Sequence, residues 1–162
     1  MDLILWRHAE AVVAEDGEDD LSRPLTPKGE RQATRIAQWL DRQLSDGTRI
    51  LASPARRTEQ TALALQRKFK FREELGPQST AEAVLELVKW QAPFTQAPKQ
   101  SILLVGHQPW MGDVITRLTH LPASACAVRK GAVWWLRARE RNQQLQILVF
   151  SVINPEVVGG LQ

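Results

Sequence analysis

Short apolar runs alternate with longer stretches in which apolar residues recur at helical spacing. Runs at 3–6, 49–52 and 101–105 predict strands that are buried on both faces, as in a parallel sheet. The helical spacing predicts amphipathic helices at 27–46, 54–68, 79–90 and 110–120. The two kinds of element follow one another along the chain, which is typical of α/β proteins.

Capping signals support the predicted helix starts. Thr26 followed by Pro27 is a good N-cap with proline at the first helical position, and Ser53-Pro54 repeats that pattern. Ser79 lies three positions before Glu82, which is the spacing of a capping box. Gly47 marks the end of the first helix.

The last third of the chain has a different pattern. Residues 132–136 and 145–150 are rich in strand-forming residues, and a polar turn at 141–142 joins them. They predict an antiparallel hairpin. We therefore expect one α/β domain spanning 1–162, with a largely parallel central sheet, helices on both faces and C-terminal antiparallel strands that close it. The segment 92–99 contains two prolines and is expected to be a loop.

Composition and charge narrow the functional classes. The chain is 43% hydrophobic and 24% charged, and its net charge of +3 is too modest to indicate nucleic-acid binding. It has no apolar run long enough for a membrane span and no signal-peptide pattern at its start, so we expect no membrane association and a cytoplasmic location. Cys126 is the single cysteine and is expected to be a half-buried structural thiol. The acidic stretch 10–20 and the basic stretch 129–141 are interpreted as solvated faces.

Reactive side chains follow all three predicted parallel strands. Arg7 and His8 come after the first strand, Ser53 and the arginine pair 56–57 after the second, and His107 after the third. The carboxyl ends of parallel strands meet at one edge of a sheet, where ligands bind. Two histidines and at least two arginines should therefore converge there. Imidazole is a nucleophile or proton shuttle, and guanidinium suits phosphate oxygens.

These residues resemble the signature of a known family. Arg7-His8-Ala9-Glu10 is similar to the Arg-His-Gly motif of the histidine phosphatase superfamily, also called phosphoglycerate-mutase-like. Ser53-Pro54-Ala55-Arg56-Arg57 is similar to its Ser-Pro-x-x-Arg motif, and Gly106-His107 to its second-histidine motif. The short chain, together with Arg23-Pro24-Leu25-Thr26-x-x-Gly29 and Arg57-x-x-Gln60-Thr61, looks most like the SixA-type phosphohistidine phosphatases.

The resemblance implies a two-step, metal-free mechanism without a cofactor. His8 would attack phosphorus and become a phosphohistidine, which water then hydrolyses. The three equatorial oxygens of the phosphoryl group would be held by Arg7, Arg57 and His107. Of the two adjacent arginines, the motif selects Arg57 and not Arg56. Substrate contacts are also expected from two further residues, Arg23 and Ser53.

The sequence departs from the family pattern at two positions. Ala9 replaces the glycine of the first motif, which requires a negative φ or tolerated strain there. The proton-donor glutamate of the mutase branch has no clear counterpart. Glu74 lies nearest to that place in the motif order, and Glu10 is a second candidate.

Three functions remain open. The short chain leaves little room for insertions that enclose a small substrate, so we expect a phosphorylated protein of the phosphotransfer or phosphocarrier type. A small-metabolite phosphomonoesterase and a non-catalytic phosphoprotein-binding module are the alternatives. A cysteine phosphatase is excluded, because Ala132 stands six positions after Cys126 where that class needs arginine. The oligomeric state is left open.

For three tryptophans and His120 we predict a position in the fold and no role in the reaction. Trp134 and Trp135 are adjacent on a strand and should face opposite ways, one into the core and one against a helix. Trp110 is expected near the rim of the pocket. His120, close to the end of a helix, is expected to be a capping or surface residue.

Overall fold

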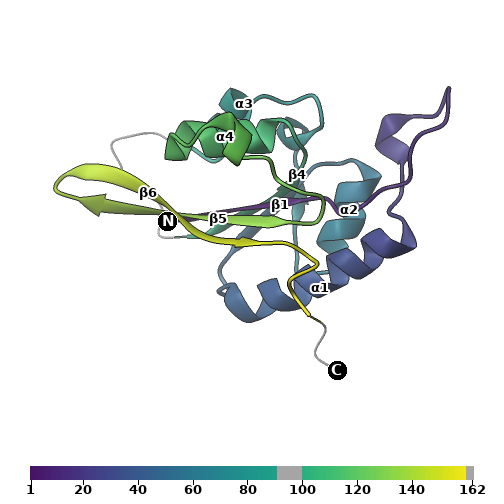
Figure 1. The fold of residues 1–162 in the computed structure, drawn as a ribbon, viewed down its shortest axis with the longest axis horizontal. Coiled ribbons are helices and arrows are strands. Elements are labelled where there is room, and N and C mark those ends of the chain that lie inside the picture. Colours follow the sequence, from purple (N-terminus) through teal and green to yellow (C-terminus); the bar gives the residue numbers. More distant parts are fainter. Residues whose placement is uncertain (91–99, 160–162) are drawn as a thin grey trace.

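The protein is built around one six-stranded sheet with helices on both faces, as the sequence predicts (Figure 1). The computed structural model describes residues 1–90 and 100–159. The predicted loop at 92–99 therefore lies outside the described residues. The strand order is β3-β2-β4-β1-β5-β6. The four strands from β3 to β1 run parallel, and β5 and β6 are antiparallel to their neighbours.

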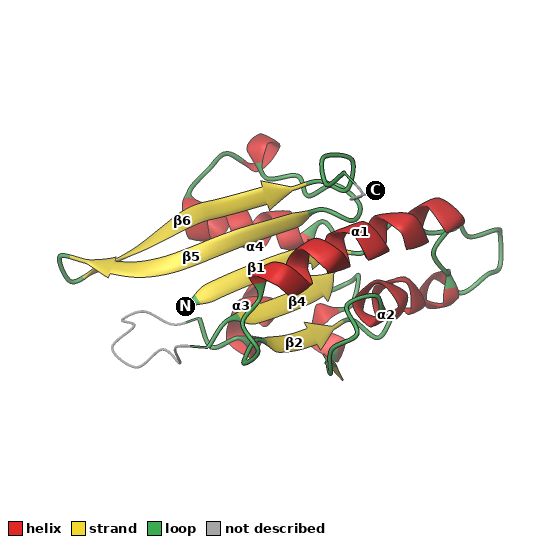
Figure 2. Cartoon of the chain, turned by 90° about the horizontal axis from the view of Figure 1, so that it is seen from below, coloured by secondary structure: helices red, strands yellow, loops and turns green. Residues whose placement is uncertain are grey.

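The strands follow the predicted runs closely, and one of them was not expected. Their bounds are β1 Asp2–Arg7, β2 Arg49–Ala52, β3 Lys70–Phe71, β4 Ile102–Gly106, β5 Val133–Arg141 and β6 Gln144–Ile153. The short edge strand β3 has no counterpart in the sequence-based prediction, because two exposed residues carry no periodicity. The hairpin of β5 and β6 extends beyond the rest of the sheet (Figure 2).

The helices form two layers. α1 Pro27–Gln43 and α2 Arg56–Leu63 cover one face of the sheet, and α3 Ala81–Leu87 and α4 Trp110–Thr119 cover the other (Figure 1). Three short 3-10 turns, η1 Asp20–Ser22, η2 Glu73–Leu75 and η3 Ala123–Ala125, lie in the connections.

The alternation of side chains along β1 divides the core between the two layers. Leu3 and Leu5 pack toward α3 and α4, whereas Ile4 and Trp6 pack toward α1 and α2. All four side chains are completely buried. Since β1 lies between β4 and β5 in the middle of the sheet, burial on both faces explains its uninterrupted apolar sequence.

The helices are shorter in the structure than their patterns suggest, and α2 and α3 differ most. α2 begins at Arg56, because Ala55 is still extended with ψ of 142° and Pro54 lies before the helix. It ends at Leu63, before the predicted end at 68. α3 is capped by Thr80, whose side chain accepts the N–H of Ala83 at 3.2 Å, so the capping residue is one position later than predicted.

The structure confirms most expectations about the bulky residues. Trp134 and Trp135 are both buried, on opposite faces of the sheet. His120 is exposed and ends α4 in the left-handed conformation. The interpretation of Trp110 as a rim residue is wrong. Its side chain is buried, its indole Nε1 donates to the carbonyl of Gly76 at 3.1 Å, and its ring fills the space beside Gly106.

The thiol of Cys126 is also more buried than expected, with 1% of the residue exposed. It packs in the apolar cluster beneath α4. A side chain in that position contributes packing rather than reactivity.

Candidate active site

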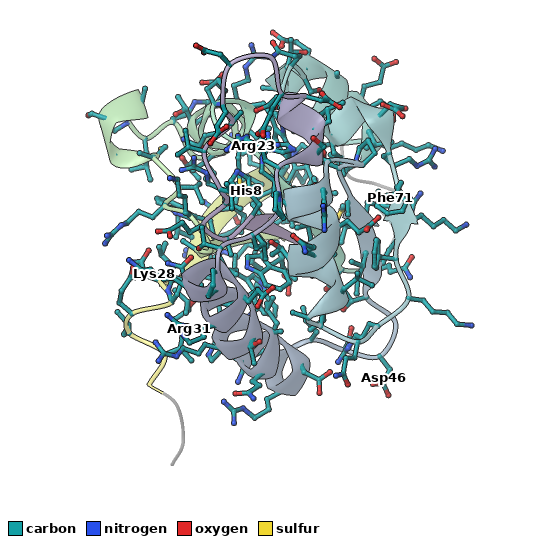
Figure 3. All side chains as sticks on the ribbon, turned by 90° about the vertical axis from the view of Figure 1, so that its right-hand side faces the viewer. His8, Arg23, Lys28, Arg31, Asp46 and Phe71 are labelled. Atoms are coloured by element: carbon teal, nitrogen blue, oxygen red, sulfur yellow. The ribbon has the colours of Figure 1, made fainter. Side chains whose placement is uncertain are left out.

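The carboxyl ends of β1, β2 and β4 bring the predicted site residues together. The backbone N–H of His8 donates to the carbonyl of Gly106, and the N–H of Ser53 donates to that of Val105, both at 3.0 Å. These bonds place the residue after each strand beside its neighbour. The imidazole rings of His8 and His107 are consequently 5.3 Å apart between centroids. Figure 3 shows His8 at this end of the molecule, with Arg23 beside it.

His8 is held with one ring nitrogen available for attack. Its Nδ1 lies 2.7 Å from the carbonyl oxygen of Ala9, which can only accept, so Nδ1 carries the proton. The lone pair is therefore on Nε2. Burial is the largest cause that lowers the pKa of His8 to about 3; the hydrogen bond to Ala9 opposes this shift, and the charges of Arg57 and Arg7 add to it. His8 is thus a neutral imidazole at ordinary pH.

The backbone at Ala9 explains how alanine replaces the glycine of the motif. Ala9 is not among the described residues that have a positive φ, so its side chain creates no strain. Its N–H donates to the hydroxyl of Thr61 at 3.1 Å. Gly29 has the stricter role, because a Cβ there would collide with the carbonyl oxygen of Glu10.

Arg57, and not Arg56, faces the site. Arg57 lies in the first turn of α2 and is 3% exposed, whereas Arg56 is exposed on the outer side of the same turn. Nη1 of Arg57 donates to the backbone carbonyl of Asp20 at 2.8 Å, and Nη2 of Arg57 donates to the carboxylate of Asp20 at 3.1 Å. The acidic connection 10–20 therefore reaches the site at its last residue.

Arg23 belongs to the same ionic group. Its Nε donates to Oδ1 of Asp20 at 3.0 Å, and its Nη1 donates to the carbonyl of Val12 at 3.0 Å. Partial burial opposes ionisation of Asp20, but Arg57 and Arg23 together hold the pKa of its carboxyl below the ordinary value. The carboxylate of Asp20 thus bridges two of the predicted arginines.

Arg7 is anchored from the C-terminal part of the chain. Its Nη1 donates to the carbonyl of Val128 at 2.8 Å, and its backbone N–H donates to the carbonyl of Ala132 at 3.0 Å. Burial, followed by the charge of Arg57, lowers the pKa of Arg7. The guanidinium remains a cation, because its ordinary pKa is far above neutrality.

His107 is paired with Ser53. Its Nε2 lies 2.8 Å from the hydroxyl oxygen of Ser53, and both residues are almost completely buried. Burial lowers the pKa of His107 to about 2, with a further contribution from His8 and Arg57. Ser53 is therefore placed behind His107, with no exposed surface of its own.

Three polar atoms of this group have no hydrogen-bond partner. They are Nε of Arg7, Nε of Arg57 and Nδ1 of His107, and they make up half of the buried side-chain atoms without a partner in the described residues. Buried donors are normally satisfied, so unpartnered ones close together indicate a ligand site. Two guanidinium donors and an imidazole nitrogen beside the free Nε2 of His8 suit the three terminal oxygens of a phosphoryl group.

A cavity of about 430 Å³ adjoins this group of residues. It is lined by Asp20, Leu21, Pro54 and Glu73, and by residues 76–79. Glu74 is exposed and is not part of the lining, whereas its neighbour Glu73 is.

The other candidate acid, Glu10, is occupied elsewhere. Its carboxylate accepts the hydroxyl proton of Thr26 at 2.9 Å and lies 3.8 Å from the ammonium of Lys28. These contacts hold it at the start of α1.

Sequence reasoning missed Asp20 and the Val128 carbonyl. Asp20 belongs to the acidic run that is interpreted as solvated, although its position three residues before Arg23 is a signal for an ion pair. No signal in the sequence could have identified a backbone carbonyl. Over 1–90 and 100–159, no group of three or more metal-ligating side chains is close enough to hold a metal ion. No helix in that same part of the chain is both long and apolar enough to cross a bilayer.

Comparison with known proteins agrees with this geometry. The profile of the histidine phosphatase superfamily (branch 1) matches residues 3–78. The phosphohistidine phosphatase SixA homolog of Haemophilus influenzae is 30% identical over 131 residues, which cover 73% of this chain and 77% of that protein. The phosphohistidine phosphatase SixA of Escherichia coli is 29% identical over 124 residues, covering 73% and 74% respectively.

Solved structures show the same architecture. The SixA structure from Agrobacterium tumefaciens superposes with a TM-score of 0.75 at 28% identity and covers 95% of this chain and 97% of that one. A second SixA structure has a TM-score of 0.77 over 98% and 100% of the two chains, and its 22% identity shows the fold alone. The chain belongs to the histidine phosphatase superfamily. Within that superfamily it is a SixA-type protein.

Proposed function

We propose that this chain removes the phosphoryl group from phosphohistidine on a partner protein, with His8 as the covalent nucleophile. The observation that carries the proposal is the set of three unpartnered buried nitrogen atoms, on Arg7, Arg57 and His107, beside the free Nε2 of His8. Each part of a phosphoryl-transfer site has a candidate, and none of them requires a metal ion.

In the first step, Nε2 of His8 attacks phosphorus. A bond forms between Nε2 and phosphorus while the P–N bond of the substrate breaks, and the electron pair of that bond leaves with the substrate imidazole. A water molecule then attacks the phosphorus on His8, which releases inorganic phosphate and restores the imidazole. The negative charge on the equatorial oxygens is stabilised by Arg7, Arg57 and His107.

The low pKa of His8 suits this role. A protonated imidazole has no lone pair to attack with, and burial together with the two arginines keeps His8 neutral. Arg23 acts on the site through Asp20, which it shares with Arg57.

The cavity beside the site supports a phosphohistidine substrate. It is large enough for an imidazole ring, and the two carboxylates of Asp20 and Glu73 on its walls favour a ring that carries a proton. A protonated imidazole is a good leaving group, so no strong general acid is needed. The two relatives named as phosphohistidine phosphatases support the same substrate class. A phosphotransfer or phosphocarrier protein is the kind of partner that would present it.

The test is a rapid-quench reaction with a ³²P-labelled phosphohistidine protein. Wild type should form an acid-labile, alkali-stable label and release phosphate, while His8→Ala should do neither. The matched control is His120→Ala, which removes an exposed histidine. Label that persists in His8→Ala contradicts the nucleophile assignment. Faster turnover of phosphoserine or of a sugar phosphate would indicate a small-metabolite phosphatase, and binding without turnover would indicate a phosphoprotein-binding module.

A further inference from the structure

The contact between Ser53 and His107 affects the protonation of the His107 ring as well as its position. The hydroxyl oxygen of Ser53 lies 2.8 Å from Nε2 of His107, and it also accepts the backbone N–H of Ala55 at 3.3 Å. Ser53 is 0% exposed, so no solvent reaches its hydroxyl group. The hydroxyl proton can therefore find an acceptor only within the protein.

Counting protons gives the direction of the hydrogen bond. A serine hydroxyl has one proton to donate and two lone pairs that accept. If Nε2–H of His107 donated to Ser53, the hydroxyl proton would be buried with no acceptor among the described residues. If the hydroxyl donates to Nε2 instead, both partners of the oxygen are satisfied and the Ala55 bond is retained.

We propose that Ser53 is a positioning residue, whose hydroxyl donates to Nε2 of His107 and thereby fixes the proton of that imidazole on Nδ1. A neutral imidazole has a single N–H, so a lone pair committed at Nε2 leaves the proton on the other nitrogen. Nδ1 is the buried atom without a partner. The tautomer stands on geometry alone, whereas its use in phosphoryl transfer rests on the proposed function.

The proposed tautomer gives His107 the charge pattern that the reaction needs. An N–H at Nδ1 attracts a phosphoryl oxygen, whereas a lone pair there would repel it. A second proton is not available to His107, because burial and the neighbouring cations keep the ring neutral. The hydrogen bond from Ser53 therefore determines whether Nδ1 of His107 is a donor or an acceptor toward the substrate.

The two histidines of the site then have the same tautomer but opposite roles, because His8 presents a lone pair to the substrate and His107 presents an N–H. The carbonyl of Ala9 accepts from Nδ1 of His8, which leaves a lone pair on Nε2 for attack. The hydroxyl of Ser53 donates to Nε2 of His107, which leaves a proton on Nδ1 for the oxygens. The difference comes from the neighbour that each ring contacts.

Nitrogen NMR of the histidine side chains tests this directly. The chain has three histidines. His120→Gln removes one set of signals, and a single further variant then assigns the signals of the remaining two rings. In wild type, both nitrogens of His107 should be resolved, with Nδ1 protonated and Nε2 unprotonated. Added inorganic phosphate should shift the Nδ1–H resonance. A wild-type spectrum with the proton on Nε2 of His107 overturns the proposal without any variant.

Two variants give the functional readout. Ser53→Ala should release the constraint on His107, change its nitrogen shifts and lower kcat/KM for an aryl phosphate by about 10- to 100-fold. Ser53→Thr keeps the hydroxyl and should restore the wild-type shifts. The control is Thr58→Val, which removes a buried hydroxyl that donates only to the carbonyls of Ser53 and Ala55, at 2.8 and 2.7 Å. It should leave the His107 shifts unchanged.

The outcomes separate this proposal from the proposed function. Unchanged His107 shifts in folded Ser53→Ala contradict the role of Ser53, whatever the enzyme hydrolyses. The expected tautomer in a protein that shows no turnover would keep the role of Ser53 and remove the proposed function. If Ser53→Ala fails to fold, the wild-type spectrum still decides.

Discussion

Asp20 contacts Arg57 along one edge of its guanidinium group. The backbone carbonyl of Asp20 accepts from Nη1 at 2.8 Å and its carboxylate accepts from Nη2 at 3.1 Å, while Nε on the other edge has no partner. The pair therefore orients Arg57 and still leaves a donor for a substrate oxygen. It also places a negative charge near the oxygens of any bound phosphoryl group.

Asp20→Asn should tighten the binding of inorganic phosphate. Asparagine keeps the backbone carbonyl and one side-chain acceptor for the arginines, but it removes the charge that repels a phosphate dianion. A unit charge at this range is worth on the order of 1 kcal/mol, or about fivefold in affinity. Product inhibition of aryl phosphate hydrolysis measures the change. Asp16→Asn is the control, because it alters net charge equally on an exposed part of the same connection. Weaker phosphate inhibition in Asp20→Asn would show that the carboxylate acts only by holding Arg57.

Arg57→Ala should lower the rate by on the order of 10²-fold or more, as expected when a strong contact to the transition state is lost. Arg56→Ala should have little effect, because its side chain points away from the buried site. Steady-state kinetics on an aryl phosphate compare the two. Equal losses in both variants would mean that general positive charge on α2, and not a specific contact, accounts for the effect.

The buried histidines should make stability depend on pH. In the folded protein the pKa values of His8 and His107 are about 3 and 2, below the value of 6.5 for a free imidazole. Below about pH 6.5 the unfolded chain binds protons that the folded protein does not, so the free energy of unfolding is largest above that pH and falls as pH decreases. The slope should reach up to about 1 kcal/mol per pH unit for each histidine.

Urea unfolding followed by tryptophan fluorescence, between about pH 7 and pH 5, measures that slope. His107→Gln should flatten it, whereas His120→Gln, at an exposed position, should not. An unchanged slope in His107→Gln would contradict a neutral, buried His107.

The position of Glu73 changes the choice of general acid. Glu73 lines the cavity beside Asp20 and Glu74 does not, although the motif order favours Glu74. Glu73→Gln should slow the hydrolysis of an alkyl phosphate by on the order of 10-fold or more and that of phosphohistidine far less, since only an alkoxide needs a proton to leave. Glu74→Gln makes the same change of charge one residue away. A larger effect from Glu74→Gln would return the role to that residue.

Catalysis should survive the removal of metal ions. Arginines supply the positive charge that divalent cations provide in many phosphoryl-transfer enzymes. Dialysis against a strong chelator should therefore leave kcat on an aryl phosphate unchanged. Recovery of a lost rate by one divalent ion would contradict the proposed site.

The sequence predicts the elements of this fold well, because burial leaves a local pattern. The uninterrupted apolar run of β1 and the repeated spacing along α1 both follow from the faces they bury. Element ends are predicted less well. α2 starts two residues after Pro54, because the backbone at Ala55 is not yet helical.

The residues of the site can likewise be predicted only in part. Motifs identify His8, Arg57 and His107, because each follows a strand at a fixed offset. The contact of Ser53 with His107 and the carboxylate of Asp20 between two arginines depend on how separate elements approach one another. No local pattern encodes those approaches, and the spacing of Asp20 from Arg23 indicates only one of its two arginine contacts.

The central position of β1 has a consequence for synthesis. The strand that carries Arg7 leaves the ribosome before both of its neighbours in the sheet, β4 and β5, and Arg7 is anchored by Val128, 121 positions later. During translation β1 therefore has no neighbouring strand to pair with until β4 and β5 have been made. A nascent chain stalled before Val128 should hold no phosphate and should bind a chaperone instead.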